Sequence, residues 1–182
     1  MPKKVLVVLA EGFEEVEALT PVDFLLRAGA QVTLAGLGSK TVSGSHGISV
    51  NCECTLDETP ASGWDAVVLP GGMPGATNLA ASALVTERIM NTFNEGRLVC
   101  AICASPAVVL APLGILRDRR AVCYPGMDER APEVRFCSSK VLTDKNVVTA
   151  RGAGCAAEFA FEIISALYGR EKADSVAFKV VY

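Results

Sequence analysis

Four short segments of the chain are apolar without alternation, with Thr33 as their one polar residue, and the residues between them show helical spacing. The apolar segments are residues 5–10, 32–35, 66–69 and 98–102. Strands without alternation are typical of parallel sheets covered on both faces. The helical spacing predicts helices over residues 14–28, 82–95, 105–113 and 156–168. Strands that alternate with helices predict an α/β fold, with a doubly wound, mostly parallel sheet and helices on both faces.

Two other segments show β-like patterns that suggest hairpins. They are residues 41–54 and residues 134–151, the second with turn-forming residues at 143–146. No linker, internal repeat or low-complexity stretch interrupts the 182 residues. We therefore expect one domain over residues 1–182.

Composition narrows the class of protein. With 51% hydrophobic and 20% charged residues, the chain can bury a large core, which excludes an intrinsically disordered protein. The apolar runs are much shorter than a membrane span, so no membrane association is expected. A net charge of −3 without a basic block argues against nucleic acid as a partner. The chain begins without the features of an export signal, so we expect a cytoplasmic protein.

Seven cysteines and one histidine bear on redox and metal chemistry. An odd number of cysteines without an export signal indicates reduced thiols. No metal site is expected, because His46 is the only histidine and the chain lacks a second Cys-x-x-Cys motif. Cys100 and Cys103 are not expected to form a disulfide. Residues 100–102 read as strand, which sets the Cα atoms of Cys100 and Cys103 about 10 Å apart, beyond the limit of about 7 Å for a disulfide.

Three loops of the expected sheet carry chemically active residues. Open α/β sheets bind ligands at the carboxyl ends of their strands, and these loops follow the first, third and fourth apolar segments. They are residues 11–17, 70–75 and 103–106. The first is acidic, the second is rich in glycine and the third begins with a cysteine. These loops are the candidate functional site.

Cys103 directly follows an apolar segment and precedes an expected helix. Ser105 suits the N-cap of that helix, and Pro106 suits its first position. The partial positive charge at a helix N-terminus favours a thiolate placed just outside it, as in a nucleophile elbow. The alternative is a buried structural cysteine, and the sequence context alone leaves both interpretations open.

The acidic loop contains four glutamates, Glu11, Glu14, Glu15 and Glu17. A favourable interaction with the helix dipole, together with solvation, explains three of these glutamates without a functional role. Glu17 differs, because it lies between two apolar residues and one helical step from Phe13 and Pro21. A carboxyl that points inward there is expected to be protonated and able to donate a hydrogen bond to a nearby thiolate.

Gly71 and Gly72 directly follow the third apolar segment. The pair is either an ordinary turn or a device that directs a backbone amide at the developing charge of a substrate oxygen. The loop is too short to hold a phosphate, and no Gly-Lys-Ser/Thr pattern is present.

Several stretches resemble, in family order, the ThiJ/PfpI superfamily, in the branch of the parkinsonism-associated protein deglycase. They are residues 12–18, 21–23, 27–29, 68–72, 101–104, 151–154, 158–160 and 169–171. Each is short, but the spaced combination is specific and covers nearly the whole chain. The resemblance implies a flavodoxin-like fold, a single domain of the class I glutamine-amidotransferase-like type, and a homodimer.

The resemblance also implies catalytic roles. Cys103 matches the reactive cysteine of the family, a nucleophile that can be oxidised to a sulfinate. Glu17 matches its protonated acid, which would shuttle protons. Gly72 and Ala104 match the two backbone amides of an oxyanion hole. The family activities implied by this match need no cofactor.

Substrate- or anion-binding roles are implied for Arg27, His46 and Tyr124. Arg27 and His46 match the region where the family places anion-binding groups at a dimer interface, and His46 stands where an arginine is usual. Tyr124 stands where some members have histidine, and Ala153 replaces the proline of an Arg-Gly-Pro-Gly motif. No histidine follows Cys103, so the Cys-His dyad of the protease-like branch is not expected.

Three functions remain as hypotheses. The first is a cysteine-dependent, cofactor-free glyoxalase or deglycase that acts on a small dicarbonyl, methylglyoxal, or on its early adducts, and protects against oxidative or carbonyl stress. The second is a redox-sensing stress chaperone that uses the same oxidisable cysteine. The third, thiamine-precursor biosynthesis, is weaker because the chain has no phosphate loop.

Overall fold

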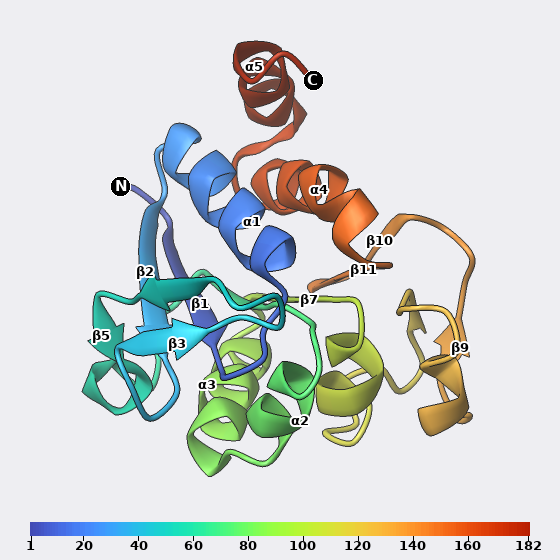
Figure 1. Ribbon diagram of the computed structural model, residues 1–182. Helices are drawn as coiled ribbons and strands as arrows, with labels where there is room; N and C mark the ends of the chain where they lie inside the picture. The colour runs from blue at the N-terminus through green and yellow to red at the C-terminus, as the bar shows by residue number, and fades with distance from the viewer.

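A seven-stranded sheet forms the centre of the computed structural model, which describes residues 1–182 (Figure 1). Its strand order is β10-β11-β7-β6-β1-β2-β5, and all neighbours are parallel except β10 and β11. These strands are β1 (Lys4–Leu9), β2 (Gln31–Gly36), β5 (Cys54–Thr55), β6 (Ala66–Leu69), β7 (Leu98–Ile102), β10 (Val141–Asp144) and β11 (Val147–Ala150). The expected mostly parallel, doubly wound sheet is confirmed.

Alternate residues of β1 face two separate hydrophobic cores. Val5, Val7 and Leu9 belong to one core, and Leu6 and Val8 belong to the other. The first core is covered by α1 (Glu15–Arg27), α4 (Ala156–Tyr168) and α5 (Arg170–Lys179), and the second by α2 (Gly75–Ala80) and α3 (Ala83–Asn94). Figure 1 shows these two groups of helices on opposite sides of the sheet. Because both faces are covered, the strands are apolar without alternation.

Both expected hairpins are present, but they have different places in the fold. β3 (Thr41–Ser43) and β4 (Ser49–Asn51) form a separate antiparallel ribbon. β10 and β11 instead extend the central sheet, because β11 pairs in parallel with β7. This long-range pairing places the end of β11 beside the end of β7.

The helix expected over residues 105–113 is wrong in type and in length. The structure has a five-residue π-helical segment, Pro106–Leu110, in which the Ala111 N–H donates to the Pro106 carbonyl at 3.0 Å. Pro106 stands at the first helical position, as expected. Ser105 stands at the N-cap position, as expected, but its side chain makes no capping hydrogen bond, because its hydroxyl donates to the Pro70 carbonyl at 2.6 Å. The hydroxyl is therefore committed to the loop after β6 and does not cap the segment that follows it.

Several short elements have no clear signal in the sequence. They are α2, α5, β5, β8 (Arg120–Ala121), β9 (Arg135–Phe136) and the 3₁₀ turns Leu56–Glu58, Asp128–Arg130 and Ala153–Cys155. Strands of two residues are too short to show a period, and α5 is mostly polar. None of the helices combines the length and the apolar character that crossing a bilayer requires.

Candidate active site

The order of the strands reverses between β1 and β6, and the loops that follow these two strands meet there. The Glu14 N–H donates to the Gly71 carbonyl at 3.0 Å, and the Gly75 N–H donates to the Gly12 carbonyl at 3.2 Å. Such a reversal at the carboxyl ends of parallel strands is where open α/β sheets form ligand sites. β7 lies next to β6, so the residue after β7 also reaches this place.

Cys103 occupies a sharp turn directly after β7. Its φ of +65° lies in the left-handed region, which costs energy for a residue with a side chain. Hydrogen bonds hold this backbone on two sides. Its N–H donates to the Ala150 carbonyl at 2.9 Å, and its carbonyl accepts the Tyr124 N–H at 2.8 Å. The turn therefore has the shape of a nucleophile elbow, and the thiol is partly accessible.

Two backbone amides face the sulfur of Cys103. The N–H groups of Gly72 and Ala104 both act as hydrogen-bond donors toward it. These are the two amides that the family resemblance implies for an oxyanion hole. They lie in the loops after β6 and β7 respectively.

Glu17 points inward, as the sequence predicts, and its residue is only 1% exposed. Glu14 caps α1 by accepting the Glu17 N–H at 2.7 Å, which fixes the first turn of the helix. The Glu17 carboxyl accepts the Gly71 N–H at 2.9 Å and shares a hydrogen bond with the Cys103 thiol. The Ala153 N–H also bonds to it. Four segments of the chain thus meet at one carboxyl group.

Burial dominates the electrostatics of this pair. It raises the pKa of Glu17 to about 7, although hydrogen bonds from Gly71 and Cys103 act in the opposite direction. Burial, followed by the charge of the Glu17 carboxylate, raises the pKa of the Cys103 thiol to about 12. The amides of Gly72 and Ala104 lower this pKa, in the direction expected for a sulfur at the start of a helix, but the desolvation of the sulfur outweighs them.

The two acids are coupled, since each negative charge opposes the other. A thiolate at Cys103 is compatible with a protonated Glu17 and is strongly disfavoured beside an ionised one. A protonated Glu17 can also donate its hydrogen bond to the sulfur. The protonated acid inferred from the sequence is therefore the form of Glu17 that suits a thiolate.

Gly71 is the residue that lets the two side chains meet. A Cβ at this position would lie 2.5 Å from the Cys103 Cβ and 2.6 Å from Glu17 Oε2, so no larger residue fits without displacing the pair. Gly72 has a φ of +85°, and a Cβ there would lie 2.5 Å from the Glu14 nitrogen. The Gly-Gly sequence is thus required by close packing, which the sequence alone leaves undecided.

Tyr124 is close to this centre, and its residue is half exposed. Its ring lies against Gly152, where a Cβ would be 3.3 Å from the ring and 3.9 Å from Glu17 Oε1. Neither the place of Gly152 nor the amide contact from Ala153 could be predicted from the sequence, because only the pairing of β11 with β7 brings these residues to Glu17.

Arg27 and His46 are not brought to Cys103 within one chain. Arg27 ends α1, ten residues beyond Glu17 and thus about 15 Å along the helix axis, and its Nε donates to Asp23 Oδ2 at 2.7 Å. His46 lies in the β3–β4 turn, where its Nδ1 is 2.8 Å from Glu15 Oε2. The hydrogen bond and charge of Glu15 raise the pKa of His46, so it keeps its proton to a higher pH than a free histidine.

Glu15 differs from the solvated residue that the sequence suggests. It is 5% exposed, and its carboxylate accepts the N–H groups of His46 at 2.8 Å and of Ile48 at 3.4 Å. The ligand atoms of Glu14, Glu15 and His46 lie within 4.8 Å of one another, a grouping that could hold a metal ion. Since the Glu15 oxygens already accept hydrogen bonds from the turn, its structural role is to fasten the hairpin to α1.

Comparison with known proteins identifies the family of this chain. The sequence pattern of the DJ-1/PfpI family matches residues 3–166. The chain belongs to the DJ-1/PfpI family. Among its relatives, Protein dj-1beta of Drosophila melanogaster is 38% identical over 180 residues, which are 97% of this chain and 96% of that protein.

Other DJ-1/PfpI relatives differ in length or carry informative names. Glutathione-independent glyoxalase DJR-1.2 of Caenorhabditis elegans is 32% identical over 168 residues, 91% of this chain and 89% of that protein. Two Arabidopsis thaliana relatives, DJ-1 homologues B and A, are 38% and 37% identical to 93% of this chain. The chain spans less than half of their lengths, 39% of homologue B and 44% of homologue A. The solved structure of oxidised DJ-1 from Toxoplasma gondii superposes with a TM-score of 0.95 at 36% identity, covering 99% of this chain and 98% of that one.

The raised pKa of Glu17 in this DJ-1/PfpI protein predicts a dependence of stability on pH. The folded protein holds this proton more tightly than the unfolded chain does. That contribution is fully present below about pH 4.5 and is lost as the pH rises through about 7. Relative to Glu17→Gln, which cannot ionise, the wild type should lose about 3 kcal/mol of unfolding free energy between pH 4.5 and 8. Urea denaturation of both proteins at several pH values measures this difference.

A matched control is Glu95→Gln, because Glu95 is exposed. Its profile should run parallel to that of the wild type. If the Glu17→Gln and wild-type profiles also run parallel, Glu17 is not a protonated buried acid.

Proposed function

We propose that the protein is a cysteine-dependent, cofactor-free enzyme of the glyoxalase or deglycase type. Its substrate would be methylglyoxal or an early adduct of methylglyoxal, and its role would be protection against carbonyl or oxidative stress. The observation that carries this proposal is the contact between the Cys103 thiol and the buried Glu17 carboxyl, with the amides of Gly72 and Ala104 directed at the same sulfur. The name of the Caenorhabditis elegans relative, a glutathione-independent glyoxalase, supports the same chemistry.

The first step forms a bond between sulfur and carbon. The Cys103 thiol passes its proton to the Glu17 carboxylate, and the thiolate formed beside the protonated Glu17 adds to the aldehyde carbon of methylglyoxal to give a hemithioacetal. The negative charge moves to the former aldehyde oxygen, where the N–H groups of Gly72 and Ala104 can donate hydrogen bonds to it. These donors are fixed by the backbone, so they need little reorganisation during the reaction.

The second step moves protons, and the third releases the product. The oxyanion takes the proton of Glu17, which leaves Glu17 as a carboxylate. This carboxylate moves the proton of the same carbon to the neighbouring carbon, and the hydroxyl proton passes to the neighbouring oxygen, so the hemithioacetal becomes the thioester of a 2-hydroxy acid. Water then hydrolyses the thioester, which yields lactate and restores the Cys103 thiol. A carboxyl with a pKa of about 7 can both accept and donate a proton near neutral pH.

Lactate formation by the purified protein tests this proposal. Methylglyoxal is supplied without glutathione and in the presence of a metal chelator, and lactate is measured enzymatically. Lactate formed at a rate proportional to protein concentration supports the proposal. Absence of lactate above the rate without protein contradicts it.

A second candidate function is sensing of peroxide by the same cysteine. The partly accessible Cys103 sulfur beside a protonated Glu17 is a favourable place for a sulfinate, because the acid can donate a hydrogen bond to it. Two molecules of peroxide would each be reduced to water as the sulfur passes through sulfenate to sulfinate. A related structure is described as oxidised DJ-1. Mass spectrometry after mild peroxide treatment would show a gain of two oxygen atoms at Cys103.

The exposed apolar face of α1 supports the proposed homodimer. Val16, Leu19 and Leu26 are 50%, 37% and 53% exposed, and Ile48 of the β3–β4 turn is 57% exposed. An isologous contact through this face would bury these side chains against a second copy. It would also bring Arg27 and His46 toward the partner's site, where the resemblance expects anion-binding groups.

Leu26→Glu is therefore expected to shift the protein from dimer to monomer. A charge at this position opposes burial of the face, while the residue lies at the far end of α1 from Glu17. Light scattering should give twice the chain mass of 19.1 kDa for the wild type and the single chain mass for the variant. Leu84→Glu is the control, because Leu84 of α3 is similarly exposed on the other side of the sheet. Equal masses for wild type and Leu26→Glu would place the interface elsewhere.

A further inference from the structure

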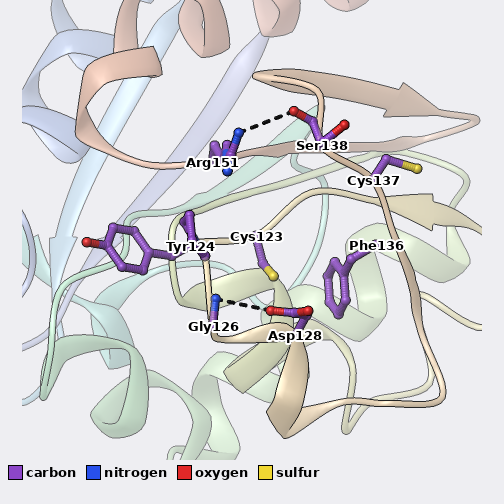
Figure 2. Close-up of a pocket in the computed structure, with 9 residues that line it drawn as sticks. Cys123, Tyr124, Gly126, Asp128, Phe136, Cys137, Ser138 and Arg151 are labelled. Carbon is purple, nitrogen blue, oxygen red and sulfur yellow. Dashed lines mark hydrogen bonds between the residues drawn. The ribbon is translucent and has the colours of Figure 1, made fainter.

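A second concave site lies beside the candidate active site and does not include Cys103. It has a cavity volume of about 380 Å³, within the range of small-molecule sites. Figure 2 shows Arg151 on one side of this pocket, Asp128 on the other and Cys123 between them. Phe136 forms part of its wall. The proposed catalytic mechanism leaves this pocket unused.

Arg151 provides a positive charge that no acidic residue neutralises. None of the ion pairs in the structure involves Arg151, although it is partly buried. Its Nη1 donates one hydrogen bond, to the Ser138 carbonyl at 3.3 Å (Figure 2). Its backbone N–H donates to the Lys140 carbonyl at 3.0 Å, which fixes the base of the side chain. The remaining guanidinium donors can therefore serve a ligand.

The rest of the wall is suited to a carbon skeleton. Phe136 contributes its ring, and Cys123 and Cys137 line the pocket as well. The ring of Tyr124 instead points away from Phe136 and lies against Gly152 (Figure 2). Burial raises the pKa of Cys123 to about 11, so this thiol is neutral near pH 7. The Asp128 carboxylate accepts the Gly126 N–H at 3.1 Å and is the one acidic group in the lining.

We propose that this pocket binds a small organic monocarboxylate, with its carboxylate on Arg151 and its carbon skeleton against Phe136. A planar guanidinium matches a carboxylate through two parallel hydrogen bonds. Arg151 and Asp128 are the charged residues of the lining, and their formal charges cancel, so a monoanion that pairs directly with Arg151 suits the pocket better than a phosphate dianion. The apolar wall likewise favours an acid with an aliphatic or aromatic body.

The pocket is joined to the Cys103 site by two shared segments. Tyr124 lines the pocket, and its backbone N–H bonds to the Cys103 carbonyl. Arg151 precedes Gly152, which lies against the Tyr124 ring and near Glu17. A carboxylate bound here would thus contact both segments that flank the reactive pair. Binding itself does not depend on the proposed reaction.

The test measures protection of a pocket thiol, with benzoate as the probe and benzamide as its neutral analogue. Cys137 is partly exposed, so iodoacetamide should label it, and peptide mass spectrometry gives the rate. Benzoate should slow this labelling in a saturable way, and benzamide should not. The measurement is repeated with Cys103→Ala, in which the proposed reaction cannot occur, so loss of catalysis and loss of binding are separated.

Substitution of Arg151 identifies the anchor. Arg151→Gln should raise the dissociation constant of benzoate about tenfold or more, as expected for a lost charge-assisted hydrogen bond. Arg151→Lys should retain part of the affinity, because the charge remains. Arg117→Gln removes an exposed arginine outside the pocket and should leave protection unchanged. No protection in the wild type, equal protection by benzamide, or unchanged protection in Arg151→Gln would each overturn the proposal.

Discussion

Replacement of Cys103 by serine is expected to lower lactate formation from methylglyoxal by about 10³-fold or more, the scale on which loss of a catalytic nucleophile acts. A serine hydroxyl occupies nearly the same space, so the turn after β7 should be preserved. In the same buried site a hydroxyl gives up its proton far less readily than a thiol, so it supplies much less nucleophile than Cys103 does beside Glu17. Initial rates with purified wild type and Cys103→Ser measure the effect, and circular dichroism verifies the fold.

Cys100→Ser is the matched control for this experiment. Cys100 lies three residues earlier in β7 and is completely buried in the first hydrophobic core. Its hydroxyl variant should lose stability, because a polar group is then buried, and should retain most of the activity of the folded protein. Equal loss of activity in the two variants would contradict the assignment of Cys103 as the nucleophile.

Substitution of Glu17 should produce the second large effect. Glu17→Gln should lower lactate formation about 10²- to 10⁴-fold, the usual contribution of a general acid–base residue. The amide can still accept the hydrogen bond from the Gly71 N–H, so the site should keep its shape. It cannot take up and return a proton. Initial rates measured with Glu17→Gln and with the control Glu95→Gln distinguish a lost proton shuttle from a general effect of charge.

Glu17→Asp tests the contact between the carboxyl and the sulfur. Aspartate is one methylene shorter, so its carboxyl should withdraw from both the Gly71 N–H and the Cys103 sulfur. Under mild peroxide, Cys103 in this variant should reach a different distribution of oxidation states, which mass spectrometry of the intact protein reports. If the wild type and Glu17→Asp oxidise indistinguishably, the carboxyl does not control the sulfur.

The positions of Cys103 and Glu17 followed from local pattern. Cys103 stands directly after an apolar segment, and the structure confirms that this segment is β7. Glu17 stands among apolar residues one helical step apart, and the structure confirms that it is buried. Both features depend on the periods of strand and helix, which neighbouring residues reveal. The catalytic roles themselves stay predictions.

Contacts between residues that are distant in the sequence could not be predicted from such local patterns. The pairing of β11 with β7 brings Ala153 to Glu17. Gly71 leaves room for the contact between Glu17 and Cys103, two side chains that no local period connects. Ser105 bonds to the loop after β6 and so leaves the helix that follows without its expected cap. Each of these contacts depends on which strands become neighbours.

The sequence by itself determined the α/β class, the main strands and helices, and the places of the cysteine, the acid and the two glycines, because hydrophobic period and turn chemistry are local. Only the tertiary structure decided the protonation of the site. Its pKa values depend on how much water the surrounding segments remove from Cys103 and Glu17, and on the mutual repulsion of their charges. The same is true of the pocket at Arg151. A cavity and an arginine without an acidic partner exist only once remote segments pack together.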